Sequence, residues 1–173
     1  MSTTLAYSTA GASVDRQGDL SDKNRVEQAI RGFVKDFGRD AALNMETCLH
    51  CGMCADACHF YQATEEPRYS PVWKIELFKR AYLREYGPFA FLHRLFHFTA
   101  KPTLAQLEQW QELLFDACTL CGRCSLICPM GLDLEGLIGQ ARHGMAKAGL
   151  VPRELWEAGE RSTSEAGLEE AVA

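Results

Sequence analysis

The sequence lacks any long run of apolar residues. No stretch approaches the roughly 18 apolar residues that a membrane-spanning helix needs, so we expect no membrane span. Its first residues, MSTTLAYSTAGASVDRQGDL, do not show the basic and then apolar segments of a secretory signal. Basic residues are in deficit as well, and the formal net charge of −5 argues against a nucleic-acid partner. We therefore expect a cytoplasmic protein.

The alternation of apolar and polar residues that marks a half-buried strand is also absent. Apolar residues recur instead at helical spacing, so the predicted fold class is all-α. A first predicted helix begins at Asp22 and stops at Gly38. Its apolar face is expected to contain Val26, Ile30, Phe33 and Phe37.

A second predicted helix covers residues 71–86, between a capping Ser70 and the helix-ending pair Gly87-Pro88. Its apolar face is expected to contain Ile75, Phe78, Tyr82 and Tyr86. Its other faces are expected to be solvated, with Lys74, Lys79, Arg80 and Arg84.

Two further helices have clear start signals. Thr103 and Gln106 match a capping box, and Asp133 can cap a helix that runs to about Ala148. Leu107, Trp110 and Leu114 are expected to continue the first of these helices into the second cysteine run. Each glycine in the second costs roughly 1 kcal/mol relative to alanine. Such glycines either loosen the helix or, as we prefer, mark points of close approach to another backbone or to a cluster: Gly136, Gly139 and Gly144.

Composition suggests the domain bounds. We expect a mobile N-terminal tail at residues 1–20, an α-helical domain at 21–156 and an acidic C-terminal tail at 157–173. Within the domain, the aromatic segment 89–98 has three open interpretations: core packing, a docking surface for a partner subunit, or a membrane-surface helix.

The eight cysteines stand in two runs of one spacing, C-x2-C-x2-C-x3-C, within CLHCGMCADACHF and CTLCGRCSLICPM. This spacing is used to ligate cubane [4Fe–4S] clusters. It lets a short loop wrap three corners of a cube, and Gly52 and Gly122 allow the tight backbone that wrapping requires. The sequence therefore predicts two [4Fe–4S] clusters.

The fourth cysteine of such a run ligates the other cluster in two-cluster proteins. Cluster one is accordingly assigned to Cys48, Cys51, Cys54 and Cys128. Cluster two is assigned to Cys118, Cys121, Cys124 and Cys58. This crossing would join two helical halves across the long insertion, so loss of iron should remove much of the stability of the fold.

Other uses of the cysteines suit the pattern less well. Zinc sites usually take paired hooks from separate segments, and four cysteines within eleven residues fit a cube better than a tetrahedron. A disulfide framework does not suit a cytoplasmic chain. A catalytic cysteine is disfavoured because all eight already have a ligand role. Two clusters held close together would instead carry single electrons in two steps.

Three residues beside the cysteines have two interpretations each. His59 stands where the second run has Pro129, and is either a partly exposed residue at a helix end or a donor that tunes cluster two. His50 and Arg123 lie inside the runs and are interpreted as surface residues. Arg123 would alternatively ease the addition of an electron nearby.

These residues resemble the α-helical ferredoxin family, and within it the C-type subunits of heterodisulfide reductases and their bacterial relatives. The likeness is carried by CLHCGMCADACHFY, SPVWKIELFKRAYLREYG and CGRCSLICPMGLDL, and covers roughly residues 40–156. Succinate dehydrogenase iron–sulfur subunits share this fold, but their second run typically supports a [3Fe–4S] cluster with one cysteine replaced. All four cysteines are present here, which favours two full cubanes.

The resemblance implies a non-catalytic electron-transfer subunit of a cytoplasmic heterodisulfide reductase-like complex, in sulfur-compound oxidation. The implied partners are a flavin-containing A-like subunit and a catalytic B-like subunit with CCG motifs. This chain contains neither CCG nor G-x-G-x-x-G, so flavin binding and disulfide cleavage are assigned to the partners. The alternatives are an iron–sulfur subunit of a membrane-associated quinone-linked dehydrogenase and a zinc-stabilised interaction module.

Overall fold

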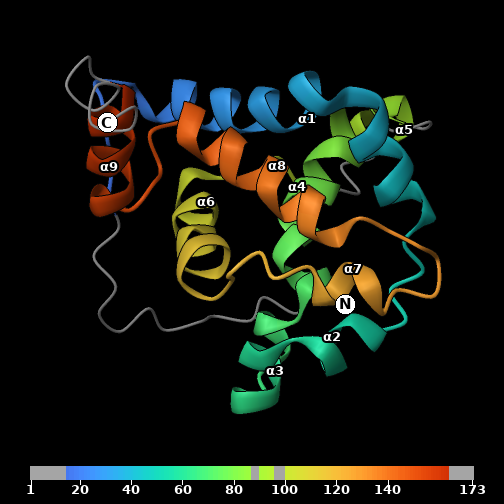
Figure 1. Ribbon diagram of the computed structural model, residues 1–173. Helices are drawn as coiled ribbons and strands as arrows, with labels where there is room; N and C mark the ends of the chain where they lie inside the picture. Colours follow the sequence, from blue (N-terminus) through green and yellow to red (C-terminus); the bar gives the residue numbers. More distant parts are fainter. Residues whose placement is uncertain (1–14, 87–89, 96–99, 164–173) are drawn as a thin grey trace.

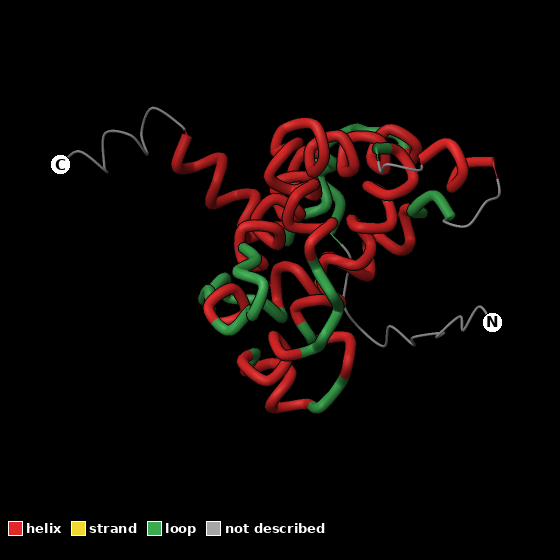
Figure 2. Tube along the Cα trace, turned by 90° about the vertical axis from the view of Figure 1, so that its right-hand side faces the viewer, coloured by secondary structure: helices red, strands yellow, loops and turns green. Residues whose placement is uncertain are grey.

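The computed structural model describes residues 15–86, 90–95 and 100–163, without the side chains of 34–37 and 92–94. All regular structure in this part of the chain is helical (Figure 1), and it contains no strand (Figure 2). The predicted all-α fold class is therefore confirmed. No helix in these described ranges has both the length and the apolar character needed to cross a membrane.

The long helices α1 (Asp22–Thr47) and α8 (Leu134–Lys147) pack against each other at the top of Figure 1. A Cβ built on Gly144 would meet the carbonyl oxygen of Ala29 and stand 3.0 Å from the backbone nitrogen of Phe33. Only a residue without a side chain allows the two backbones to lie this close. The predicted close approach is therefore confirmed for Gly144.

The other two glycines of α8 have different surroundings. A Cβ on Gly136 would meet the side chain of Asp133, because Asp133 Oδ1 accepts a hydrogen bond of 2.8 Å from the Gly136 backbone nitrogen. Asp133 thus caps α8 as predicted. A Cβ on Gly139 would have no described atom within 4 Å, so the predicted close approach finds no support there.

The helix predicted to stop at Gly38 does break there, because Gly38 has a non-helical φ of 27° and ψ of −93°. A second helical segment follows this kink and carries α1 on to Thr47, which the sequence did not predict. The consequence is functional: α1 leads directly into the first cysteine run, with Cys48 at its C-cap. Its predicted core residues Val26, Ile30 and Phe33 are buried, and the side chain of Phe37 lies outside those described.

Helix α4 (Pro71–Glu85) lies below α1 and α8, and it begins with Pro71 in its first turn as predicted. Ser70 occupies the N-cap position, but its hydroxyl donates 2.7 Å to the carbonyl oxygen of Pro67 and does not cap α4. The predicted side-chain cap is therefore wrong. The ring centroids of Phe78 and Phe33 lie 4.8 Å apart, joining α4 to α1.

The predicted apolar face of α4 is buried except at its end. Ile75, Phe78 and Tyr82 are in the core, whereas Tyr86 is 48% exposed because it follows the last helical residue. The predicted solvated face is wrong at Lys74, whose side chain is only 1% exposed.

Helix α6 (Leu104–Gln111) begins at the predicted capping box, in which Thr103 and Gln106 exchange side-chain and backbone hydrogen bonds. It continues into the π-helical turn η2 (Glu112–Asp116), which leads to the second cysteine run. Trp110 fixes this pair of elements to α4, because its indole nitrogen donates 3.0 Å to the carbonyl oxygen of Lys74. The segment continues the helix as predicted, and its residues Leu107, Trp110 and Leu114 are buried.

Short elements border the two cysteine runs along the chain. They are α2 (Met53–Ala57), α3 (His59–Thr64), η1 (Pro67–Tyr69) and α7 (Arg123–Leu126). Of these, α2, α3 and α7 lie in the lower part of Figure 1. Helices α2 and α7 lie side by side, although one follows the first cysteine loop and the other the second.

The remaining described segments lie at the edges of the fold. Helix α5 (Ala90–Leu95) exposes Phe91 and Leu95. The other aromatic side chains of segment 89–98 lie outside the described residues, so its three interpretations stay open.

Residues 15–20 contact the core, because the buried Arg25 donates 2.8 Å hydrogen bonds to the carbonyl oxygens of Gln17 and Ala148. Helix α9 (Arg153–Thr163) crosses the predicted bound at residue 157. The three domain bounds stay predictions.

Candidate metal centres

The two cysteine loops follow the same backbone path. His50 and Leu120, each just before the second cysteine of its run, have φ values of 53° and 51°. Gly52 and Gly122, each just after that cysteine, have φ values of 85° and 75°. A left-handed conformation costs an ordinary residue roughly 1–2 kcal/mol, so it persists at His50 and Leu120 only because the surrounding loop imposes it. The sequence repeat therefore produces one cradle twice.

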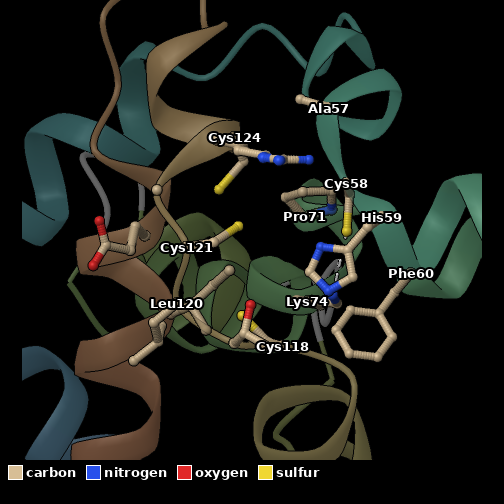
Figure 3. A pocket seen from close by; sticks show the side chains of 15 residues that line it. Ala57, Cys58, His59, Phe60, Pro71, Lys74, Cys118, Leu120, Cys121 and Cys124 are labelled. Carbon is tan, nitrogen blue, oxygen red and sulfur yellow. Dashed lines mark hydrogen bonds between the residues drawn. The ribbon is translucent and has the colours of Figure 1, made fainter.

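The eight cysteines line two pockets. The first pocket is lined by Cys48, Cys51, Cys54 and Cys128, and its volume of about 330 Å³ includes some open solvent. The second pocket is lined by Cys58, Cys118, Cys121 and Cys124 (Figure 3), and its volume of about 360 Å³ also includes open solvent. The pockets divide the cysteines into the same two sets that the crossing predicts. That each set ligates a cluster stays a prediction.

The crossing arises from the end of each run. Cys58 has an extended conformation between α2 and α3, with φ −85° and ψ 115°, and so it lines the pocket of the other run. Cys128 follows α7 and lines the first pocket together with Pro129 and Met130. Each pocket therefore has three cysteines from one loop and one from the other, which would tie the loops together once filled.

The cysteines differ in burial, and burial changes their acidity. Cys54 and Cys58 are buried, while Cys51 and Cys121 are exposed. Burial raises the pKa of Cys54, and it raises the pKa of Cys124 to about 11. Such thiols are protonated at neutral pH. Because metal ligands are thiolates, loading either pocket would release these protons.

Lys74 is the buried charge at the second pocket, although its charge had placed it on a predicted solvated face. Its ammonium donates to the carbonyl oxygen of Ala117, just before the second run, and its Nζ lies 3.8 Å from Cys58 Sγ. The Nζ also lies 5.3 Å from the centre of the Phe60 ring. A signal existed in the sequence, because position 74 is four residues before the buried Phe78 and hence on the same helix face.

Arg142 of α8 is a residue that the sequence analysis missed. Its Nε donates 2.7 Å to the carbonyl oxygen of Leu114, and its Nη2 donates to the carbonyl oxygen of Cys118. Burial lowers the pKa of the Arg142 guanidinium, which the neighbouring Cys118 and Asp116 oppose. The side chain thus fixes the segment that enters the second cysteine loop.

The three residues singled out beside the cysteines are all exposed. His59 is the first residue of α3 and lines the second pocket, with its ring centroid 4.4 Å from that of Phe60. His50 Nε2 lies 2.9 Å from Nζ of Lys79. Arg123 begins α7 and lines the second pocket. Their exposure agrees with the interpretation of each as a surface residue.

The donor set suits iron–sulfur clusters. Each pocket offers four thiols, the soft ligands that such clusters take, around a space with largely apolar walls. Val72, Leu132 and Leu134 provide those walls in the first pocket. Across the described residues, no three His, Cys, Asp or Glu side chains are grouped so as to hold a single metal ion.

A family model described as a 4Fe-4S dicluster domain matches residues 44–132, about half of the chain. The matched segment contains both cysteine runs and the helices between them.

Several curated proteins are similar to the chain. The Hdr-like menaquinol oxidoreductase iron-sulfur subunit 2 of Archaeoglobus fulgidus is 34% identical over 135 residues, or 75% of this chain and 24% of that protein. The Hdr-like menaquinol oxidoreductase iron-sulfur subunit of Archaeoglobus profundus is 35% identical over 154 residues, or 84% and 27%. The D subunit of the dihydromethanophenazine:CoB--CoM heterodisulfide reductase of Methanosarcina acetivorans is 29% identical over 111 residues, or 64% and 26%.

The chain thus spans about a quarter of the length of each of these relatives. No solved structure gives a significant match.

Proposed function

Because the chain belongs to the 4Fe-4S dicluster domain family, we propose that it is the iron–sulfur electron-transfer subunit of a cytoplasmic heterodisulfide reductase-like complex. In this proposal its cysteines ligate two [4Fe–4S] clusters in the crossed sets. Single electrons pass between a flavin-containing A-like subunit and a B-like subunit with CCG motifs. The chain itself turns over no substrate.

The observation that carries the proposal is the pair of adjoining four-cysteine pockets. Cys54 of the first pocket is close enough to Cys124 of the second to contribute to its raised pKa. Helices α2 and α7 lie side by side between the loops. A [4Fe–4S] cluster supplies one-electron redox chemistry when bound. The residues of this chain would hold two such groups close together and would shield their inner faces from water with buried apolar side chains.

The relatives named as heterodisulfide reductase subunits favour sulfur chemistry at the complex, and oxidation of a sulfur compound is the direction that we propose.

A second candidate function is favoured by other names among the relatives. Two of them are called menaquinol oxidoreductase subunits. In this alternative the chain is the iron–sulfur subunit of a membrane-associated, quinone-linked assembly. Its own clusters and pockets would be the same, and only the partner and the location would differ.

Affinity purification of the tagged chain from its native host, under anaerobic conditions, tests the proposal. We expect the complex in the soluble fraction, together with a flavoprotein and a subunit that contains CCG motifs, as identified by mass spectrometry. Recovery from the membrane fraction with an integral membrane subunit would overturn the cytoplasmic complex and support the quinone-linked one. A colourless chain that contains zinc would overturn both and leave a zinc-stabilised interaction module.

A further inference from the structure

Lys74 directs a buried positive charge at one of the two pockets. Its side chain is 1% exposed and lines the second pocket (Figure 3). Its Nζ donates to the carbonyl oxygen of Ala117 and lies 3.8 Å from Cys58 Sγ. In the part of the chain that the structure describes, no Asp or Glu carboxylate oxygen lies within 4.0 Å of Lys74 Nζ, the distance that defines an ion pair.

A buried ammonium without a carboxylate needs another source of negative charge. A carbonyl oxygen and the face of an aromatic ring carry only partial charges, so they offset little of the cost of removing an ammonium from water. A cube held by four thiolates is an anion in both of its oxidation states, and reduction adds one more negative charge to it. The second pocket, once filled, would therefore supply the missing anion within hydrogen-bond distance of Lys74.

The first pocket has no comparable charge among its described residues. Apart from its cysteines, its ionisable lining residue is His50, which is exposed, and the neighbouring Lys79 is only half-buried. Charges in water are screened far more than buried ones. At the second pocket, Arg123 and Glu135 also line the wall, but they have opposite signs, and neither is buried. Lys74 is thus the buried charge that distinguishes the two pockets.

We propose that Lys74 is a positioning residue that acts through the Cys58 sulfur and raises the reduction potential of cluster two above that of cluster one. The inference rests on the proposed function. One electron, supplied by a reduced flavin, would add to cluster two first, and no bond would form or break. The reduced cluster gains more from the buried charge and the N–H···S contact than the oxidised cluster does. In the singly reduced protein, the electron rests on cluster two.

The test is an anaerobic redox titration followed by EPR, on wild type, Lys74→Met and the control Lys23→Met. Methionine keeps the length and the apolar stem of lysine, and Lys23 is an exposed residue of α1. The signal that Cys58→Ser alters identifies cluster two. We expect it to be the first reduced in wild type. In Lys74→Met its reduction equilibrium should fall at least tenfold, which is about 59 mV for one electron.

The outcomes separate this inference from the function on which it rests. Wild type without iron–sulfur signals would overturn the proposed function itself. Wild-type iron content in Lys74→Met with unchanged potentials would overturn the role of Lys74 alone. The same potential shift in Lys23→Met would also overturn the role of Lys74, because the loss of any lysine charge would then shift the potential.

Two more variants cover the case in which Lys74→Met holds less iron than wild type. Lys74→Arg keeps the charge, and Lys74→Gln keeps only an uncharged donor. The inference is supported if Lys74→Arg retains both clusters and the wild-type order of reduction, while Lys74→Gln loses iron or has a lowered potential of cluster two. Equal behaviour of the Arg and Gln variants overturns it, because the charge would then have no part in the effect.

Discussion

The first cysteine loop and the second follow one path up to their fourth cysteine, and they differ after it. Both place left-handed residues on either side of the second cysteine and then enter a short helix, α2 or α7. Cys58 then leads straight into α3 and lies beside the buried Lys74, whereas Cys128 leads to Pro129 and a turn at Gly131. The repeated residues build two like cradles, and the residues outside the repeat make their surroundings unequal.

The largest expected effect concerns the crossed ligand sets. Under the crossing, Cys58→Ser and Cys118→Ser disable the same cluster, so the double variant should lose no more iron than either single variant. The combination of Cys58→Ser with Cys48→Ser should disable both clusters. Iron per chain should fall from about eight to about four in the first double variant, and close to zero in the second. The reverse pattern, measured as iron and acid-labile sulfide, would mean that each run binds its own cluster.

Removal of iron should affect the two halves of the molecule unequally. The cysteine loops, α2 and α7 would lose the clusters that hold them together, while the packing of α1 on α8 depends on apolar contacts and on Gly144. We expect hydrogen exchange of the chelated protein to show lost protection first in residues 48–58 and 118–128. Protection of the α1–α8 contact should outlast it. Equal loss in both regions would show that the core has no stability independent of the metal.

The two loop glycines test whether the cradles are equivalent. Alanine at Gly52 or Gly122 must adopt a positive φ, at a cost of roughly 1–2 kcal/mol. A Cβ on Gly122 would stand 3.1 Å from Glu135 Oε2, the movable end of a side chain, and one on Gly52 would meet nothing described within 4 Å. We therefore expect similar decreases in Tm, at about 2–4 °C per kcal/mol. A large decrease for only one variant would contradict the equivalence.

The smallest expected effect belongs to His59. It lines the second pocket but is exposed, so water screens its influence on cluster two. His59→Ala should shift the potential of cluster two less than Lys74→Met does, and leave cluster one unchanged, in the same EPR titration. A shift as large as that of Lys74→Met would restore His59 as the tuning donor and weaken the case for the buried lysine.

The sequence predicted what depends on local pattern. The helical periodicity, the capping box at Thr103 and the Asp133 cap are all present in the structure. The predicted likeness to heterodisulfide reductase iron–sulfur subunits is confirmed by the family and its relatives. These features follow from spacing within a short segment, and that spacing is visible in one sequence.

Features that depend on distant contacts were not predicted. Gly38 ends a helix on local rules, but α1 resumes beyond it to Thr47. Lys74 was assigned to a solvated face by its charge, although its position among Ile75 and Phe78 places it on the buried one. Arg142 fixes a carbonyl group 24 residues away in the chain. For Arg142 the deciding partner belongs to another element, which a single sequence does not reveal.

The most direct test of two unlike clusters in two like cradles is iron and sulfide analysis of the anaerobically purified chain, combined with an EPR redox titration. We predict about eight iron and eight sulfide per chain, two separate one-electron steps, and spin coupling between the clusters when both are reduced. A colourless protein with zinc in place of iron, or a single cluster of about four iron, would contradict the account.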